Sequence, residues 1–223
     1  SDKWGFINNK SELIIPCVFD KAFSFSEGMA EVKQNGKWGF INNIGELTIP
    51  CIYDWANSFE EGLATISTEN NKWGSINKKG ELIIPFIYDN QYSFEKGLAQ
   101  VEQNGKYGLI NNKGKLIIPC IYDRIYSFIE GLAQVKQNDK LGFVNDNGEL
   151  VIPCIYDDVG SISEGMISVK KNDKWGLLNN KGELIIPCIY DRVTNFKEGS
   201  ATVYQNDKGC LLYTSPSPRD RTR

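Results

Sequence analysis

The sequence predicts an all-β fold built from tandem repeats of one small unit. Three observations support this prediction. A Lys-aromatic-Gly group, with leucine as the central residue in one copy, recurs at steps of 34 or 35 residues. Short apolar runs lie between Asn-Gly or Asn-Asp pairs, which are typical of two-residue hairpin turns. A proline follows the last apolar run of every copy. A constant period that carries the whole pattern means that each copy buries its apolar face only against its neighbours.

The stretch from residue 98 to residue 119 shows the elements of one unit. Residues 98–103 alternate between apolar and polar side chains, as a half-buried strand does, and Asn104-Gly105 suits the hairpin turn after it. A second strand starts at Lys106. The third strand, residues 116–118, is apolar on both faces, so we expect it to be buried, and we expect Pro119 to end it. Each unit therefore reads as three antiparallel strands and an irregular crossover.

The repeat array covers residues 1–208. Its copies start near the lysine of each Lys-aromatic-Gly group, at Lys3, Lys37, Lys72, Lys106, Lys140 and Lys174. A period of 34 residues is short for a four-stranded propeller blade, which takes about 40. We therefore expect an open, curved array, with a closed propeller-like ring as the alternative.

Composition narrows the possible functions. The 223 residues contain 41% hydrophobic and 24% charged residues and no histidine, and the formal net charge is −3. No apolar run approaches the roughly 20 residues of a spanning helix, and no basic stripe suits nucleic acid, so we expect neither a membrane span nor a nucleic-acid partner. The lack of histidine removes the side chain most used for proton transfer near neutral pH. We expect no enzymatic activity.

Two periodic positions carry side chains that can bind metal ions. Five of the repeat prolines are directly followed by a cysteine: Cys17, Cys51, Cys120, Cys154 and Cys188. In the third copy the residue after the proline is Phe86. Because phenylalanine cannot bind a metal and no short Cys-x-x-Cys spacing occurs, we expect small buried hydrophobes, with disulfides or metal as the alternative. Free thiols favour a reducing compartment such as the cytoplasm. One aspartate per repeat is too sparse for a calcium site, so we expect these aspartates to cap the turn after each Tyr-Asp pair. No metal and no cofactor is expected.

The whole pattern resembles the bacterial WG repeat family, also called KWG repeats. The matching elements are Lys-Trp-Gly-Phe-Ile-Asn, then Gly-Glu-Leu-Ile-Ile-Pro, then Tyr-Asp, then Phe-x-x-Gly-Leu-Ala-x-Val, and they extend from Asp2 to about Lys208. Tyr107 and Leu141 depart from the family's tryptophan. The resemblance implies a non-enzymatic β-repeat scaffold without catalytic residues.

Residues 209–223 break the repeat pattern. From about Cys210 the string resembles translated sequencing-adapter sequence, and we expect it to be artefactual, with an ordinary disordered tail as the alternative. The chain also starts inside a repeat at Ser1. We therefore expect an excerpt of a longer protein, whose export signal need not lie within it.

The crossovers vary in charge and size while their neighbours do not, which is typical of repeat proteins that recognise partners on a fixed frame. The candidate partner-binding residues are Phe23, Trp55, Tyr92, Arg124, Tyr126 and Arg192. Unselected surface drift predicts the same variability. The predicted function is a non-catalytic scaffold that binds a protein or cell-surface partner. Carbohydrate or cell-wall binding through Trp55, Tyr92 and Tyr126 is the alternative, and an enzyme with paired carboxylates is the third hypothesis.

Overall fold

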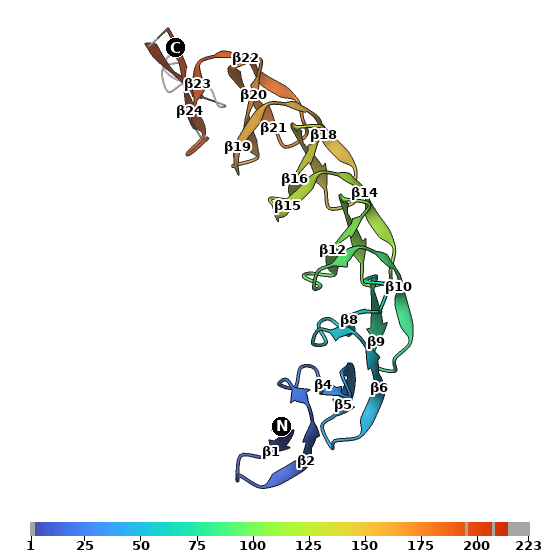
Figure 1. The fold of residues 1–223 in the computed structure, drawn as a ribbon. Coiled ribbons are helices and arrows are strands. Elements are labelled where there is room, and N and C mark those ends of the chain that lie inside the picture. Colours follow the sequence, from blue (N-terminus) through green and yellow to red (C-terminus); the bar gives the residue numbers. More distant parts are fainter. Residues whose placement is uncertain (1–2, 195, 207, 214–223) are drawn as a thin grey trace. The chain divides into compact units, whose positions relative to one another are not determined.

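The computed structural model describes residues 3–194, 196–206 and 208–213 of the chain. Every element found there is a β-strand, and no helix suited to crossing a membrane occurs among these residues. The chain divides into two compact units, Ser1–Cys120 and Ile121–Arg223, which we call unit 1 and unit 2. Within each unit, small antiparallel sheets follow one another in sequence order (Figure 1). The predicted all-β fold of tandem units is thus confirmed, whereas the open, curved array stays a prediction.

The first sheet has two strands, β1 (Trp4–Ile7) and β2 (Leu13–Phe19). Three four-stranded sheets follow, with neighbouring strands in sequence order: β3 (Lys21–Ala22), β4 (Met29–Gln34), β5 (Lys37–Asn42) and β6 (Leu47–Tyr53); β7 (Trp55–Ala56), β8 (Leu63–Ser67), β9 (Trp73–Asn77) and β10 (Leu82–Tyr88); β11 (Asn90–Gln91), β12 (Leu98–Gln103), β13 (Lys106–Asn111) and β14 (Leu116–Tyr122).

Unit 2 continues with two more four-stranded sheets: β15 (Arg124–Ile129), β16 (Leu132–Gln137), β17 (Lys140–Asn145) and β18 (Leu150–Tyr156); β19 (Asp158–Ser163), β20 (Met166–Lys171), β21 (Lys174–Asn179) and β22 (Leu184–Tyr190). A three-stranded sheet follows: β23 (Arg192–Val193), β24 (Ser200–Gln205) and β25 (Lys208–Tyr213). The segment assigned to the tail begins within β25, and residues 214–223 lie outside the described residues.

The full sheets contain four strands, so the expectation of three strands per unit is corrected. The additional strand lies in the crossover. In the second repeat it is β7, where Trp55 pairs with Ser67 and Ala56 pairs with Ile66. Two residues are too few to show a strand period, which is why sequence reasoning missed it. Since β7 follows β6 after the single residue Asp54, each sheet combines strands from two sequence repeats.

The predicted hairpin turns are confirmed. Asn35 and Gly36, between β4 and β5, have φ angles of 52° and 82°. Both angles lie in the left-handed region, which the primed two-residue turns require. The next turn depends on Asn42, whose side-chain oxygen accepts hydrogen bonds from the backbone N–H groups of Ile44 and Glu46 at 3.1 and 2.9 Å. The Asn-x-x-Gly-Glu pattern therefore specifies the turn between β5 and β6.

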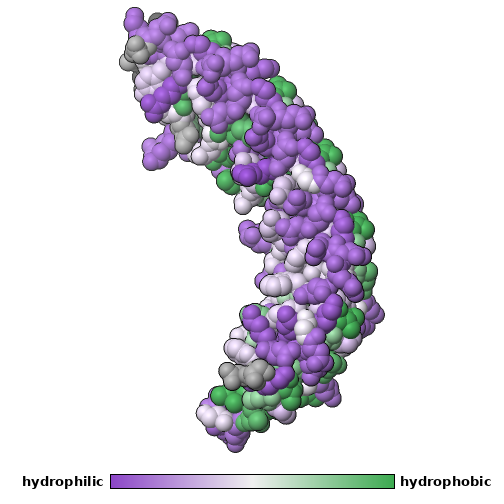
Figure 2. All heavy atoms as spheres, in the orientation of Figure 1, coloured by the Kyte–Doolittle hydropathy of each residue, from purple (hydrophilic) through white to green (hydrophobic). Residues whose placement is uncertain are grey.

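In every sheet from β1–β2 to β19–β22 the last strand runs through its proline, which corrects the expectation that proline ends it. Strand β6 contains Pro50 and is the edge strand of its sheet. An edge strand tolerates a residue that lacks an N–H group. The expectation that this strand is buried on both faces is also wrong, since Leu47 and Ile52 are exposed. Hydrophobic side chains of the edge strands reach the surface in both units (Figure 2).

The glycine of the Lys-aromatic-Gly group permits this edge strand to approach its neighbour. A Cβ atom on Gly39 would lie 2.5 Å from the carbonyl oxygen of Ile49 and 2.7 Å from the backbone nitrogen of Cys51. The register between β5 and β6 shifts at the same place. Glycine is therefore required here, because any side chain would collide with backbone atoms.

Hydrophobic side chains of successive sheets pack together within each unit. In unit 1, Phe40 of the β3–β6 sheet and Phe59 of the β7–β10 sheet are fully buried, with ring centroids 4.9 Å apart and ring planes at 64°. Ile49, Ile66 and Ile76 belong to the same buried cluster. The core is thus distributed over the junctions between sheets, as expected for a repeat protein.

Candidate functional site

The six candidate residues lie on the crossover strands or directly after them, and all six are exposed. Phe23, Trp55 and Tyr92 belong to unit 1. Arg124, Tyr126 and Arg192 belong to unit 2, and the Arg192 guanidinium lies 5.7 Å from the centre of the Tyr204 ring. The structure brings Phe23 and Trp55 together in unit 1 and places Tyr126 at a pocket in unit 2, whereas Tyr92, Arg124 and Arg192 belong to neither setting.

Phe23 and Trp55 meet in unit 1 through Trp38 of β5. The Phe23 ring stacks on Trp38 with centroids 5.6 Å apart, and the Trp55 ring lies 6.2 Å from Trp38. We call these three residues the Trp38 cluster. Trp38, the aromatic residue of a Lys-aromatic-Gly group, is buried, whereas Trp55 is 51% exposed. The Lys33 ammonium lies 5.6 Å from the Trp38 ring centre, so the cluster combines aromatic surface with positive charge.

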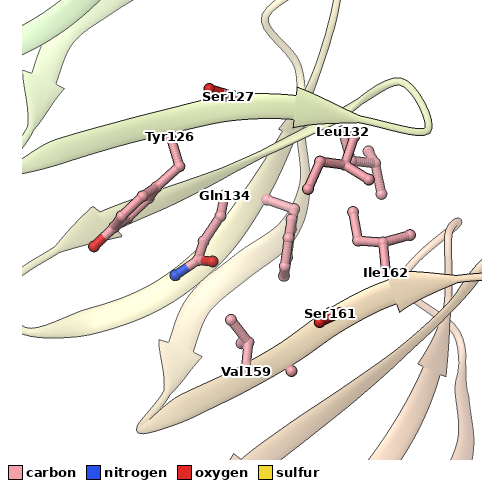
Figure 3. Close-up of a pocket in the computed structure, with 10 residues that line it drawn as sticks. Tyr126, Ser127, Leu132, Gln134, Val159, Ser161 and Ile162 are labelled. Carbon is pink, nitrogen blue, oxygen red and sulfur yellow. The ribbon is translucent and has the colours of Figure 1, made fainter. Parts of the chain in front are cut away.

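A second setting is a pocket in unit 2, between the β15–β18 sheet and the β19–β22 sheet. Its volume is about 420 Å³. The lining residues come from both sheets (Figure 3): Tyr126, Ser127, Ile129, Leu132, Gln134, Phe143, Val159, Gly160, Ser161 and Ile162. Of the six candidate residues, Tyr126 lines it. Apolar side chains line it together with hydroxyl and amide groups, which is the usual composition of a small-ligand or side-chain pocket.

Sequence reasoning missed the other pocket residues, although a signal was present. Five crossovers carry phenylalanine at one position, and the fifth crossover has Ile162 there: Phe25, Phe59, Phe94, Phe128 and Phe196 are its equivalents. The same crossover has Gly160 where the second has Asn57. Both changes remove side-chain volume at one junction. A local departure of this kind is what a specific site needs.

A lysine and an aspartate form a recurrent ion pair at the surface of the sheets. The ammonium of Lys37 lies 2.7 Å from Asp54, and equivalent pairs join Lys3 to Asp20, Lys72 to Asp89, Lys140 to Asp157 and Lys174 to Asp191. Each pair spans 17 residues, from the start of one strand to the residue after the edge strand. These contacts explain why the lysine and the aspartate recur with the same period.

The aspartates also contact the next sheet. A side-chain oxygen of Asp89 accepts a hydrogen bond of 2.6 Å from the backbone N–H of Asn104, in the turn between β12 and β13. Asp157 does the same with Asn172 at 2.8 Å. The expectation that the aspartate caps its own turn is therefore corrected, since it caps a hairpin turn 15 residues further on.

We expect unfolding of this protein to become easier in acid. Hydrogen bonds from Lys72 and from Asn104 lower the pKa of Asp89 below its usual value of 3.8, and the pKa values of Asp157 and Asp191 are lowered in the same way. A carboxylate with a lowered pKa stabilises the fold above its unfolded-state pKa, and this contribution is lost as the pH falls through the folded-state pKa. Thermal unfolding should show a melting temperature that is steady from about pH 8 to about pH 5 and falls below about pH 4.

The matched controls are Asp89→Asn and Asp157→Asn, each measured against the natural chain. Both substitutions should lower the melting temperature at neutral pH and reduce the further loss in acid. An acid loss of the same size in the double variant would contradict the assignment to these carboxylates.

Glutamates before the crossover glycines make a second link between sheets. A carboxylate oxygen of Glu27 accepts the Gly62 N–H at 3.0 Å, and Glu130 accepts the Gly165 N–H at 2.9 Å. Both glutamates are exposed at the surface and yet bind the next sheet, because the glycine turn points its N–H group toward them.

The repeat cysteines that the structure describes are free thiols. Four are half-buried, whereas Cys17 is exposed, so burial is less complete than expected. Burial raises the pKa of the Cys51, Cys120, Cys154 and Cys188 thiols, which keeps them uncharged at neutral pH. Within the described ranges, no group of three or more Cys, Asp or Glu residues is placed to hold a metal ion.

The fold and its two settings define a class of protein: a tandem all-β repeat protein with polar links and small apolar cores between its sheets. The model of the WG containing repeat family matches the chain six times, at residues 4–38, 38–73, 73–107, 107–140, 142–175 and 175–208. The chain belongs to the WG containing repeat family.

Solved structures resemble the chain only distantly. The extracellular domain of a hybrid two-component system protein from B. thetaiotaomicron is 11% identical, with a TM-score of 0.34, over 83% of this chain and 31% of that one. Hsv2 of Kluyveromyces lactis is 9% identical, with a TM-score of 0.36, over 89% and 75% of the two chains. A eukaryotic initiation factor is 12% identical, with a TM-score of 0.40, over 85% and 60%. This chain thus spans under a third of the first structure's chain. No match was found among curated proteins.

Proposed function

We propose that this protein is a non-catalytic scaffold that binds a protein or cell-surface partner through exposed side chains of its crossovers. The observation that carries the proposal is the Trp38 cluster. A buried tryptophan that belongs to the repeat pattern supports Phe23 and Trp55, which lie at variable positions and are exposed. Exposed large aromatics on a fixed frame are the usual anchors of interfaces.

The arrangement also favours recognition over catalysis. Periodic aspartates are paired with lysines and with backbone N–H groups, so they already serve the sheets. The half-buried thiols stay protonated at neutral pH, which makes them poor nucleophiles. The pocket is lined by apolar, aromatic and uncharged polar groups, and such groups bind ligands more readily than they transfer protons.

The test uses the whole chain as bait with Trp55→Ala and Tyr126→Ala variants and quantitative mass spectrometry of the bound proteins. We expect both variants to lose a partner by about tenfold, which is typical of an interface anchor, without a change in melting temperature. The matched control is Ile44→Ala, since Ile44 is 66% exposed but lies in a hairpin turn rather than a crossover.

Two outcomes count against protein recognition. Unchanged capture of every partner by both variants would contradict the proposal. Binding of the natural chain to purified peptidoglycan or cell-wall glycans, with loss in Trp55→Ala, would favour the carbohydrate hypothesis instead.

A further inference from the structure

We propose that the unit 2 pocket binds one aromatic ring with a hydroxyl group, namely a tyrosine side chain presented by a partner polypeptide. The inference rests on the proposed function and names the chemistry that one of its two settings recognises. It depends on a comparison between two junctions, which are the places where successive sheets pack together. At the junction in unit 1 a phenylalanine ring of the crossover is buried, whereas at the junction in unit 2 the crossover has no ring.

The filled junction lies in unit 1. There Phe59, on the crossover of the second repeat, is fully buried and packs edge-on against Phe40 of the preceding sheet, with centroids 4.9 Å apart. Edge-to-face packing of this kind is favourable for aromatic pairs. The repeat frame therefore has room for a phenyl ring at this place when the preceding sheet carries phenylalanine.

The open junction lies in unit 2. Phe143 of β17 is the equivalent of Phe40 and is also buried, but Ile162 stands at the position of Phe59. Isoleucine has no ring, and Gly160 removes a further side chain from the same strand, β19. Ile162 packs against the cluster that contains Phe143, and both residues line the pocket of about 420 Å³ that lies between the two sheets. This volume is within the range of about 300–1,000 Å³ that is usual for ligand pockets.

The polar groups at the two junctions also differ: they are hydrogen-bonded to each other in unit 1 and, among the described residues, lack a partner in unit 2. In unit 1, the Ser58 hydroxyl donates to the Glu31 carboxylate at 2.9 Å, so this pair is satisfied internally. Gln134 and Ser161 take the two positions in unit 2 and line the pocket. Among the residues that the structure describes, neither of these side chains has a hydrogen-bond partner. An amide both donates and accepts hydrogen bonds, which suits a phenol hydroxyl better than a plain phenyl ring.

The rim of the pocket indicates that the ring comes from a polypeptide. Tyr126 and Ile129 line it and are exposed, and Ile129 is 53% exposed at a position where the other crossovers carry Ser, Glu or Lys. An open pocket with an apolar rim does not enclose a free molecule as ordinary small-molecule sites do. It does admit a ring whose backbone stays outside, and the apolar rim gains contact with that backbone and its neighbours.

The test measures binding to the whole chain labelled at isoleucine methyl groups, because Ile129 and Ile162 both line the pocket. The probes are N-acetyl-tyrosinamide, N-acetyl-phenylalaninamide and N-acetyl-leucinamide. We expect saturable shifts of both methyl signals with tyrosine, weaker ones with phenylalanine, and none with leucine at the same concentration. A short peptide with a central tyrosine should bind more tightly than p-cresol.

Two variants sharpen the result. Ile162→Phe restores the ring that the other crossovers carry, so it should fold stably and weaken tyrosine binding at least tenfold, with Ile129 as the reporter. Ile44→Ala, in unit 1, should bind as the natural chain does.

Three results would overturn the inference: no saturable shift with the tyrosine probe, equal binding of the leucine probe, or unchanged binding by Ile162→Phe. Binding of p-cresol at least as tight as that of the peptide would overturn the polypeptide source. None of these results touches the role of Trp55, which does not line the pocket, so the proposed function stands or fails separately in the pull-down experiment.

Discussion

Replacing Phe59 with alanine is expected to lower the free energy of unfolding of unit 1 by about 3–5 kcal/mol. Phe59 is fully buried between two sheets and packs against Phe40, so truncation leaves a cavity that neighbouring strands cannot close without breaking their own pairing. Urea denaturation followed by tryptophan fluorescence measures the effect, since Trp38 belongs to the same core cluster as Phe59.

Phe25 provides the matched control for Phe59→Ala. It occupies the same position of the first crossover but is 38% exposed, and its contact is with the half-buried Phe6. Phe25→Ala should therefore cost about 1 kcal/mol, in line with a partly solvated side chain. Equal losses in the two variants would mean that burial at the sheet junction does not set the stability of this chain.

Replacing Gly39 with alanine is the second large effect, with an expected loss of about 1–3 kcal/mol and a lasting distortion of the β5–β6 pairing. The new Cβ atom would lie 2.5 Å from the Ile49 carbonyl oxygen, and a backbone atom cannot rotate away as a side chain can. The edge strand β6 must therefore move away from β5, which weakens the pairing between the two strands.

The control for Gly39→Ala is Gly209→Ala. A Cβ atom at Gly209 would first meet ring carbons of Tyr204 at 3.2 Å, and that side chain can shift. The melting temperature should fall clearly for Gly39→Ala and little for Gly209→Ala. If the Gly39 variant melts like the natural chain, the glycine of the Lys-aromatic-Gly group does not serve close packing.

Much of the candidate site was predictable because it depends on positions rather than contacts. Trp55 and Tyr126 were identified from their variable places in a constant frame, and the structure finds both exposed. The pocket was not predicted, although Ile162 breaks a phenylalanine series. Whether a smaller residue leaves a cavity depends on what the neighbouring sheet contributes there, and Phe143 lies 19 residues away in the sequence. In the third repeat the neighbouring sheet contributes Ser75 at the position of Phe143, and the Gln91 side chain donates a hydrogen bond to its hydroxyl group inside the junction.

The sequence by itself determined the period, the all-β class, the hairpin turns and the family, because these follow from local chemistry: the left-handed turn residues, the alternation of side chains and the repetition of both. Tertiary structure alone decided that each full sheet has a fourth strand, which can be as short as two residues, and that the edge strand continues through its proline. It also decided that the periodic aspartate pairs with a lysine and accepts a hydrogen bond from a turn of the next sheet. These features arise when segments from different repeats meet. Backbone pairing and junction packing are properties of two surfaces together, and neither surface carries a signature of its partner in its own residues.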